Sequence, residues 1–377
     1  MKQGWEIKKL GEVCDIQGGS TPKRTESLYW EGGTYPWFTI EDIREQGRII
    51  TDTKQKVTKE AWDKLRVFPK DTVLLCCTAS IGEYAITHIP LTSNQQFNGL
   101  MIKDKSYLSP MYLMHYCATL KEKLSMLSGK ATIDFVSAEK VRQITLPIPP
   151  REEQERIVEE LDCLSGVIEK KREQLKELDA LAQSIFYQMF GDPITNEKGW
   201  ETCELQKVST LLNGRAYKQN ELLDEGKYKV LRVGNFFTNS NYYYSNLELE
   251  PEKYCDDGDL LFAWSASFGA FIWNGGKVIY HYHIWKVLYD KQKLNIDYYR
   301  FLLNTMTAYF MKDVHGIGMV HLTKAGMEQY VLPIPPLALQ QEFADKIEAI
   351  EKQKELIKKS ISETENLFNA RMDYYFN

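Results

Sequence analysis

The two histidines of His281-Tyr282-His283 are the residues whose types and spacing most suggest chemistry. In an extended strand both imidazoles would lie on one face, as a pair of metal ligands does. The stretch that aligns with them in the first half of the chain is Asn94-Gln95-Gln96, in which amides replace the imidazoles. Because the duplicated position does not keep a ligand set, we expect no metal site here.

Glu41-Asp42 and Ser80 carry a carboxylate pair and a hydroxyl, the groups of acid–base and nucleophilic catalysis. Gly234-Asn235 replaces the carboxylate pair in the second half, so we interpret the pair as part of a solvated or DNA-facing loop. Ser80 aligns with Ser267, but a nucleophilic serine needs a base, and His88 has no counterpart near Ser267. Small residues packed at a strand end explain both serines better than catalysis does.

Motifs of common enzymes are missing from the sequence. There is no GxxxxGK[ST] phosphate loop, no HExxH, no Asn-Pro-Pro-aromatic motif of amino-methyltransferases, and no glycine-rich dinucleotide turn. Gly316-Ile317-Gly318 is a lone GxG and has little specificity. The sequence therefore shows no motif of a known enzyme class and none that would bind a cofactor or metal.

The composition indicates a folded protein outside membranes. Hydrophobic residues make up 43% of the 377 residues, and no apolar run reaches the roughly 18 residues of a membrane span. The first residues lack the apolar stretch of a signal peptide, and the seven cysteines form no CxxC pair, which fits reduced thiols. We expect a soluble, cytoplasmic protein.

The net charge of −5 slightly disfavours tight binding of nucleic acid by the chain alone. Residues 151–190 and 337–377 together carry −6, so the rest of the chain is close to neutral. Basic groups that are clustered can still form a binding surface on a protein that is not basic overall. Charge alone therefore does not exclude a nucleic-acid partner.

The chain contains an internal duplication. Leu146-Pro147-Ile148-Pro149-Pro150 recurs as Leu332-Pro333-Ile334-Pro335-Pro336, and Gly4-Trp5-Glu6 recurs as Gly199-Trp200-Glu201. The offset between the copies drifts only from 195 to 186 residues, as short loop insertions would produce. A period of this length indicates a duplicated domain rather than a solenoid of small repeats.

Each half has the pattern of a mixed α/β domain followed by one long helix. We predict similar domains at residues 1–150 and 191–336, followed by helices at 151–190 and 337–377. Apolar runs bounded by turn residues predict strands at Tyr35 to Ile40, Thr72 to Cys77, Leu100 to Ile102, Tyr228 to Val233, Leu260 to Trp264 and Trp285 to Leu288. Helical spacing predicts helices at Pro110 to Leu127 and Asp297 to Met311.

Both long helices carry apolar residues at alternating steps of four and three, which is the seam of a coiled coil. The seam residues are Ile157, Leu161, Leu164, Ile168, Leu175, Leu178 and Ile185 in the first helix, and Phe343, Ile347, Ile350, Ile357, Ile361 and Phe368 in the second. A lone helix would expose this stripe. We therefore predict an antiparallel coiled coil with a pseudo-two-fold relation between the halves. The alternative is that each helix folds back onto its own domain.

Together, these features resemble the specificity (S) subunit of type I restriction-modification systems across essentially the whole chain. The resemblance is carried by the Gly-Trp-Glu openings with Leu10 and Leu205, both Leu-Pro-Ile-Pro-Pro segments, the helices rich in Glu and Gln, and the stop at Phe190-Gly191-Asp192-Pro193. It implies two target-recognition domains that each read half of a bipartite DNA sequence, and a helix pair that sets the gap between the half-sites.

The resemblance also implies partners. The S subunit is non-catalytic and docks two methyltransferase (M) subunits, which use S-adenosylmethionine to methylate adenine, and restriction-translocase (R) subunits join some of these complexes. Three other functions stay open on the sequence alone. One is the recognition subunit of a related type II system that combines methylation and cleavage, and another is a coiled-coil adaptor that binds no DNA. The third is an enzyme without a recognised motif, which the unmatched polar residues of the two halves disfavour most.

Side chains that read base edges or bind phosphates are expected on polar loops beside glycines. In the first domain the candidates are Ser20, Thr21, Lys23, Arg24, Arg44, Lys130 and Thr132. In the second domain they are Arg215, Lys218, Arg232, Asn235, His315 and Lys324. For each residue, an ordinary solvated surface position is the alternative interpretation.

Overall fold

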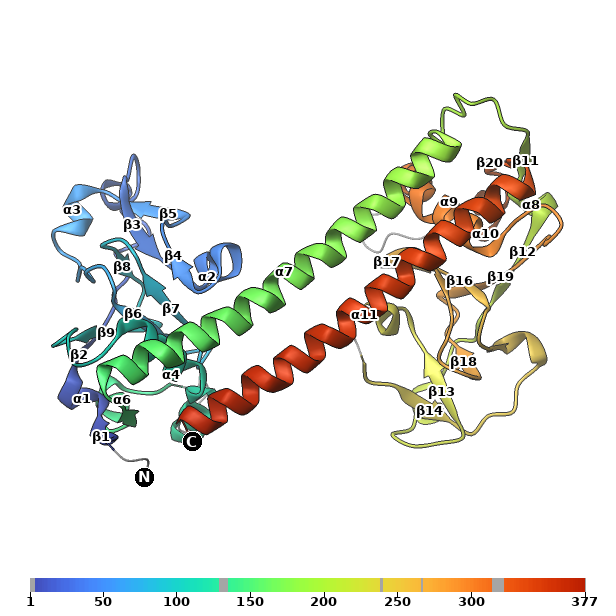
Figure 1. Ribbon diagram of the computed structural model, residues 1–377. Helices are drawn as coiled ribbons and strands as arrows, with labels where there is room; N and C mark the ends of the chain where they lie inside the picture. Colours follow the sequence, from blue (N-terminus) through green and yellow to red (C-terminus); the bar gives the residue numbers. More distant parts are fainter. Residues whose placement is uncertain (1–3, 129–134, 238–239, 266, 314–321, 377) are drawn as a thin grey trace. The chain divides into compact units, whose positions relative to one another are not determined.

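The structure is a computed structural model that describes residues 4–128, 135–237, 240–265, 267–313 and 322–376. The chain divides into two compact units. The first unit comprises Met1–Lys171 and Ser360–Asn377, and the second comprises Arg172–Lys359. Each unit therefore holds one mixed α/β domain together with parts of both long helices (Figure 1).

Two small sheets build the domain of the first unit. Their strand orders are β2-β9-β6-β7-β4 and β5-β3-β8. The strands are β2 (Cys14–Gly18), β3 (Tyr35–Phe38), β4 (Ile49–Ile50), β5 (Gln55–Val57), β6 (Val73–Cys76), β7 (Tyr84–Thr87), β8 (Thr92–Ser93) and β9 (Phe97–Ile102). Neighbouring strands are antiparallel except for β4 with β7 and β3 with β8.

The central strand β6 is buried on both faces, which explains its unbroken run of apolar residues. Val73 and Leu75 point into the core that contains α4, whereas Leu74 and Cys76 point into a second core with Phe38 and other apolar side chains. The helices of this domain are α1 (Leu10–Val13), α2 (Ile40–Gln46), α3 (Lys59–Trp62), α4 (Pro110–Ala118), α5 (Leu120–Leu127) and α6 (Ala138–Arg142).

The second unit repeats this plan with two four-stranded sheets, of orders β12-β19-β16-β17 and β14-β13-β18-β15. The strands are β12 (Ser209–Asn213), β13 (Tyr228–Leu231), β14 (Tyr243–Ser245), β15 (Tyr254–Cys255), β16 (Leu260–Ser265), β17 (Ser267–Ile272), β18 (Val278–Tyr280) and β19 (Ile284–Tyr289). Its helices are α8 (Leu205–Val208), α9 (Ile296–Phe310) and α10 (Lys324–Glu328). Strand β16 again divides its side chains between two cores.

The Leu-Pro-Ile-Pro-Pro segments pair with the opening strand of their own half. β1 (Glu6–Lys9) is antiparallel to β10 (Thr145–Ile148), and β11 (Thr202–Glu204) is antiparallel to β20 (Val331–Pro333). In each copy a buried tyrosine from the core of the same domain donates its hydroxyl to a proline carbonyl of the motif. Tyr112 bonds Pro147 at 2.8 Å, and Tyr298 bonds Pro333 at 2.9 Å. The two repeated motifs thus close each domain.

Two helices of 40 residues follow these motifs, α7 (Arg151–Phe190) and α11 (Leu337–Phe376). They are antiparallel (Figure 1). In the first unit the hydroxyl of Tyr375 bonds the carboxylate of Glu160 at 2.6 Å, and in the second unit Lys354 pairs with Asp179 at 2.7 Å. Every predicted seam residue is buried or half-buried, so the antiparallel coiled coil is confirmed.

The alternative arrangement is also partly realised, because each helix begins in one core and ends in the other. The core of the first domain contains Ile157 and Leu161 of α7 together with Met372 and Phe376 of α11. The core of the second domain contains the equivalent set from the opposite helices, Phe343, Ile347, Phe186 and Phe190. Each half therefore supplies apolar side chains that complete the core of the other half.

All six predicted strand segments overlap observed strands, and the two predicted short helical segments correspond to α4 with α5 and to α9. Across the residues that the structure describes, no helix has the length and apolar character to cross a membrane.

Candidate nucleic-acid interface

A three-residue turn joins the two sheets of each domain, and we call it the inter-sheet turn. In the first domain it is Asn94–Gln96, between β8 and β9, and in the second it is His281–His283, between β18 and β19. The expected extended strand at His281–His283 is therefore wrong, since β18 ends at Tyr280 and the chain turns directly after it. The candidate loops gather around these turns.

In the first domain the loop after β2 lies against the inter-sheet turn. The backbone N–H of Ser20 donates to the carbonyl of Ser93 at 2.8 Å, and the hydroxyl of Thr21 donates to the side-chain carbonyl of Gln95. Ser20 and Gln95 are exposed, and Thr21 is half-buried. Two predicted residues, Ser20 and Thr21, thus share one surface with Gln95, which the sequence did not single out.

Arg24 lies on an aromatic platform next to this loop. Its guanidinium carbon is 4.1 Å from the ring centre of Trp30 and 4.5 Å from that of Trp37, and one guanidinium N–H donates to Gln55 at 2.9 Å. The indole N–H of Trp37 donates to the carbonyl of Ser20. The two rings hold the guanidinium in place while its charge stays exposed, which suits contact with a phosphate or a base. Lys23 is exposed on the same segment.

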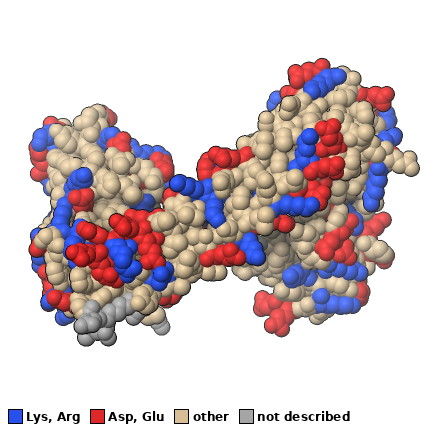
Figure 2. Space-filling view, viewed as in Figure 1, with Lys and Arg blue, Asp and Glu red and all other residues tan. Residues whose placement is uncertain are grey.

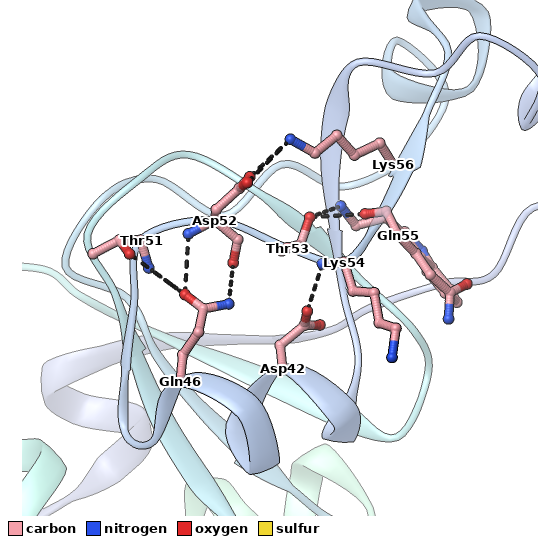
Figure 3. Close-up of polar contacts among 9 residues, drawn as sticks. Asp42, Gln46, Thr51, Asp52, Thr53, Lys54, Gln55 and Lys56 are labelled. Carbon is pink, nitrogen blue, oxygen red and sulfur yellow. Dashed lines mark hydrogen bonds and ion pairs between the residues drawn. The ribbon is translucent and has the colours of Figure 1, made fainter. Parts of the chain in front are cut away.

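Side chains of helix α2 bond the loop that leads into Gln55, the first residue of β5 (Figure 3). Gln46 accepts hydrogen bonds from the backbone of Thr51 and Asp52 and donates one back to the carbonyl of Asp52 at 2.8 Å. Asp42 accepts from the N–H of Lys54 at 2.7 Å. This bracing fixes the position of Gln55, and hence of its partner Arg24, before any ligand arrives.

Asp42 corrects the interpretation of Glu41-Asp42 as a solvated loop. The pair lies in α2, and Asp42 is fully buried. Its carboxylate accepts the N–H of Thr39 at 2.7 Å, which satisfies a backbone donor at the start of the helix. Asn235 repeats this role in the second domain, where its side-chain carbonyl accepts the N–H of Arg232 at 2.8 Å. Asn235 therefore stabilises the local backbone in addition to being a candidate DNA-binding residue.

Arg44 lines a pocket that includes no residue of the inter-sheet turn. The pocket measures about 440 Å³ and is also lined by Ser80, Glu83 and Lys121, and no histidine is among the described residues of that lining. Lys130 and Thr132 are outside the described residues. The first domain thus brings together Ser20, Thr21, Lys23 and Arg24.

In the second domain, Arg215 is anchored to a carboxylate rather than presented to solvent. Its guanidinium donates two hydrogen bonds to Glu221, at 2.9 and 2.8 Å, and this pairing, with the N–H of Lys218, lowers the pKa of Glu221 to about 2. The carboxylate is therefore ionised at any ordinary pH. The backbone of Arg215 contacts the inter-sheet turn, because its carbonyl accepts the N–H of Tyr282. Lys218 is exposed beside it.

Arg232 lies next to the histidines of the turn. It lines a pocket of about 330 Å³ with Asn235, His281 and His283, and its guanidinium lies 4.3 Å from the ring centre of Tyr243. The buried Nε of Arg232 has no hydrogen-bond partner within the described structure. Burial, together with the nearby His283 and Arg232, lowers the pKa of His281 to about 4. His281 is thus neutral at pH 7.

A second pocket adjoins the same turn and is lined with aromatic rings. It measures about 520 Å³ and contains Trp264, Tyr282, His283, Trp285 and Lys324. The two indoles stack with ring centres 5.4 Å apart, and the N–H of Trp264 donates to the carbonyl of Tyr282 at 2.9 Å. Four predicted residues, Arg215, Arg232, Asn235 and Lys324, therefore surround one turn, and His315 lies outside the described residues.

Groups with catalytic or metal-binding potential are sparse. Among the described residues, no cluster of three or more His, Cys, Asp and Glu side chains is arranged to hold a metal ion. All seven cysteines are described and none is in a disulfide. Cys76 and Cys77 are buried, and burial raises the pKa of the Cys77 thiol to about 11.

The charged side chains form no broad field of one sign on the face shown in Figure 2, where acidic and basic groups are interspersed. Gln55, Gln95, Tyr282 and Trp264 were missed by sequence reasoning. For Gln95 and Tyr282 a signal existed, because they occupy aligned positions in the two halves and differ in chemistry.

Comparison with known proteins identifies the family to which this chain belongs. The chain matches the family described as the type I restriction modification DNA specificity domain over residues 2–180 and again over 197–366. The MjaIX specificity subunit of a type I restriction enzyme from Methanocaldococcus jannaschii is 32% identical over 248 residues. That alignment covers 61% of this chain, and the chain spans only 57% of the length of that relative.

Two further proteins align over nearly the full chain. The MjaVIII specificity subunit of the same organism is 21% identical, with 97% of this chain and 92% of the relative covered. The S subunit of a type I restriction-modification system from M. genitalium has a similar fold, with a TM-score of 0.55, 13% identity, and coverage of 99% of this chain and 96% of the other. The chain therefore belongs to the family of type I restriction modification DNA specificity domains and contains two matches to it.

Proposed function

We propose that this chain is the DNA-recognition subunit of a type I restriction-modification complex. Each of its domains reads one half of a bipartite double-stranded target, and the chain itself catalyses no reaction. The observation that carries the proposal is the pair of family domains with one backbone plan and different polar side chains at equivalent surface positions. Two similar readers with different surfaces fit a target with two different halves.

The chemistry is assigned to partner subunits. Two methyltransferase subunits bind this chain and use S-adenosylmethionine to methylate adenine, and restriction subunits join in complexes that also cleave. This chain binds no cofactor of its own, and the complex works in the cytoplasm, where chromosomal DNA is accessible. The modest number of basic groups around each inter-sheet turn supports this division, because the partners then contribute much of the phosphate affinity.

The helix pair sets the gap between the half-sites. α7 continues from one unit into the other as a single helix of 40 residues, about 60 Å long at 1.5 Å per residue. B-DNA rises about 3.4 Å per base pair, so a spacer of that length corresponds to between one and two turns of DNA. Both helices carry the seam through the boundary between the units, where Lys171 bonds Ser360.

The spacer is tested by lengthening both helices at this boundary. Four residues are inserted after Lys171 and four after Lys359, so that the contacts within each unit are kept. The added length of about 6 Å is expected to lengthen the gap by one or two base pairs and leave both half-sites unchanged. Four residues inserted after the exposed Glu225 serve as the control and should leave the gap as it was. A changed half-site with an unchanged gap contradicts the spacer role.

The proposed function is tested by long-read methylation sequencing of cells that express this chain with its neighbouring methyltransferase. A bipartite adenine motif that appears only when this chain is present is the expected result. A folded, co-purifying complex that yields no such motif contradicts the proposal and favours a protein-binding adaptor. Cleavage by the same methyltransferase chain would instead indicate a related type II system.

A further inference from the structure

The inter-sheet turns of the two domains have the same backbone and different side chains. Asn94-Gln95-Gln96 stands where the second domain has His281-Tyr282-His283. In each turn the side chain of the first residue accepts a hydrogen bond from the backbone N–H of the third residue. Asn94 accepts the N–H of Gln96 at 3.0 Å, and the Nδ1 of His281 accepts the N–H of His283 at 3.4 Å. An imidazole thus takes the place of an amide without a change in the shape of the turn.

The backbone bonds that surround each turn are also duplicated. The residue after each turn donates its N–H to the carbonyl of the first turn residue. A residue at the end of the central strand donates its N–H to the carbonyl of the third turn residue. Two residues of the loop after the first strand donate their N–H groups to the carbonyls of the residues that flank the turn. In the first domain these bonds are Phe97 to Asn94, Cys77 to Gln96, Gly19 to Phe97 and Ser20 to Ser93. In the second domain they are Ile284 to His281, Trp264 to His283, Gly214 to Ile284 and Arg215 to Tyr280. The scaffold therefore holds the ends of each turn, and the side chain of the first turn residue, Asn94 or His281, holds its interior.

A glycine in each domain lets the loop and the turn approach this closely. A Cβ on Gly19 would overlap with the carbonyl oxygens of Ser93 and Asn94, and a Cβ on Gly214 would overlap with those of Tyr280 and His281. Only a residue without a side chain fits at either place. The close packing fixes the direction in which the turn points its side chains, as a reading element requires.

The middle side chain of each turn is presented to solvent. Gln95 is exposed and Tyr282 is 38% exposed. A glutamine amide matches the N6 donor and N7 acceptor of adenine in the major groove. A tyrosine offers one hydroxyl and a flat apolar face, and a histidine next to it offers a single donor or acceptor. The two turns therefore present different patterns to a base edge.

Cationic side chains flank both turns at positions suited to phosphates. In the first domain Arg24 lies on Trp37, whose indole bonds the loop at Ser20. In the second domain Arg232 and Lys324 line the two pockets that adjoin the turn. A reading residue between fixed cations is the usual arrangement of a DNA contact, because phosphate contacts set the register of base contacts.

We propose that the inter-sheet turn is the interchangeable base-reading element of each domain. Gln95 and Gln96 determine the bases accepted in one half-site, and Tyr282 and His283 determine those accepted in the other. This inference rests on the proposed function, since it names the residues through which the two domains distinguish their targets. It assigns sequence choice to the turns and phosphate contact to the arginines and lysines around them.

The test measures methylated motifs in cells that carry the chain with its methyltransferase. Gln95→Ala is expected to relax one or two positions of one half-site, and Tyr282→Ala to relax positions only in the other. A lost bidentate base contact changes discrimination by roughly tenfold to hundredfold. Gln143→Ala and Tyr187→Ala are the matched controls. Gln143 is exposed directly after α6 and Tyr187 is exposed on α7, so neither belongs to an inter-sheet turn, and both variants should leave the motif unchanged.

Two conservative variants keep the test interpretable if truncation unfolds a turn. Tyr282→Phe removes only the hydroxyl, and Gln95→Glu keeps the shape but replaces the amide donor with an acceptor, so each is expected to shift base preference in a folded protein. Absence of any bipartite motif with the wild-type chain counts against the proposed function itself. A wild-type motif that stays identical in all four turn variants, or an equal loss at both half-sites, overturns the assignment to the turns.

Discussion

At the start of each long helix, the two halves of the chain use the same side chain for the same hydrogen bonds. Gln154 and Gln340 are both fully buried, and each accepts one backbone N–H, from Ser109 and from Asn295, at 2.8 Å. Each also donates to two carbonyls, one of them the proline that ends the Leu-Pro-Ile-Pro part of its motif. Here the duplication is complete to the level of single atoms.

The inter-sheet turns show the opposite relation, because their backbone bonds are repeated while their side chains are not. The helix entries are buried and serve only the fold, so a changed side chain there leaves unsatisfied polar groups. In the turns, the scaffold and the side chain of the first turn residue bond the backbone groups, so the outward side chain of the second residue can change at little structural cost. This difference explains how one fold supports two readers of different sequence.

The largest expected effect comes from breaking the helix entries. Gln154→Leu should destabilise the first unit and Gln340→Leu the second, each by about 2–4 kcal/mol, since buried backbone groups lose their partners. Hydrogen exchange followed by mass spectrometry measures the two units separately in one sample. Gln341→Ala is the matched control, because this amide is exposed and should change stability by less than about 0.5 kcal/mol. Unequal costs for the two buried glutamines would show that the entries are not equivalent.

A smaller effect is expected at Arg24, on the side of the comparison where the domains differ. Arg24→Ala should weaken binding to one half-site only, by roughly tenfold at low salt, and reduce the salt dependence by about one counterion. Binding of the complete complex to oligonucleotides altered in either half-site measures both quantities. Arg24→Lys keeps the charge but loses the guanidinium that contacts Trp30, Trp37 and Gln55, so it should keep the salt dependence and lose part of the affinity. Equal weakening at both half-sites contradicts this placement.

The sequence predicted the features that depend on long or repeated patterns. The duplication, the α/β class, the central strands and the antiparallel seam all follow from periodicity over many residues, so single misplaced residues do not matter. The exchange of helix ends between cores did not follow. Phe186 and Met372 lie outside the seam positions, and only the paired helices bring them to the opposite domain.

Local polar structure was harder to predict. Asp42 was read as solvated because the carboxylate pair had no repeat, although Thr39-Ile40-Glu41-Asp42 fits the pattern that opens a helix. Asn235 accepts the equivalent backbone N–H with an amide, so the hydrogen bond is repeated although the residue type is not. The platform beneath Arg24 depends on Trp30 and Trp37 meeting from different elements, which no local spacing indicates.

The spacing of the turn histidines predicts a strand, because residues two apart lie on one face of an extended chain. The backbone instead turns where Gly214 and the loop after β12 press against it. A turn gives the two imidazoles different surroundings, with His281 half-buried and bonded to the backbone of His283. The imidazole of His281 can therefore titrate, whereas the amides at the equivalent turn of the first domain cannot.

The smallest expected effect is a pH dependence confined to the second unit. The pKa of His281 lies near 4 in the folded protein, against 6.5 for an unperturbed histidine, mainly because the ring is buried. Between these values the unfolded chain binds a proton that the folded chain does not, so stability falls as the pH falls from about 6.5 to about 4. Above pH 6.5 this group contributes no slope.

His281→Asn isolates this contribution, because asparagine is the residue at the equivalent position of the first turn and accepts the same backbone N–H. At pH 7 the variant should have nearly the wild-type thermal midpoint, and as the pH is lowered toward 4 its second unit should lose fewer degrees than the wild type does. Asn94→His in the first turn is the reciprocal change and should introduce a similar slope there, since the two backbones match. If the reciprocal variant melts with no new pH dependence, the two turns do not give their first residue the same surroundings, and the matched bonds are insufficient to make them interchangeable.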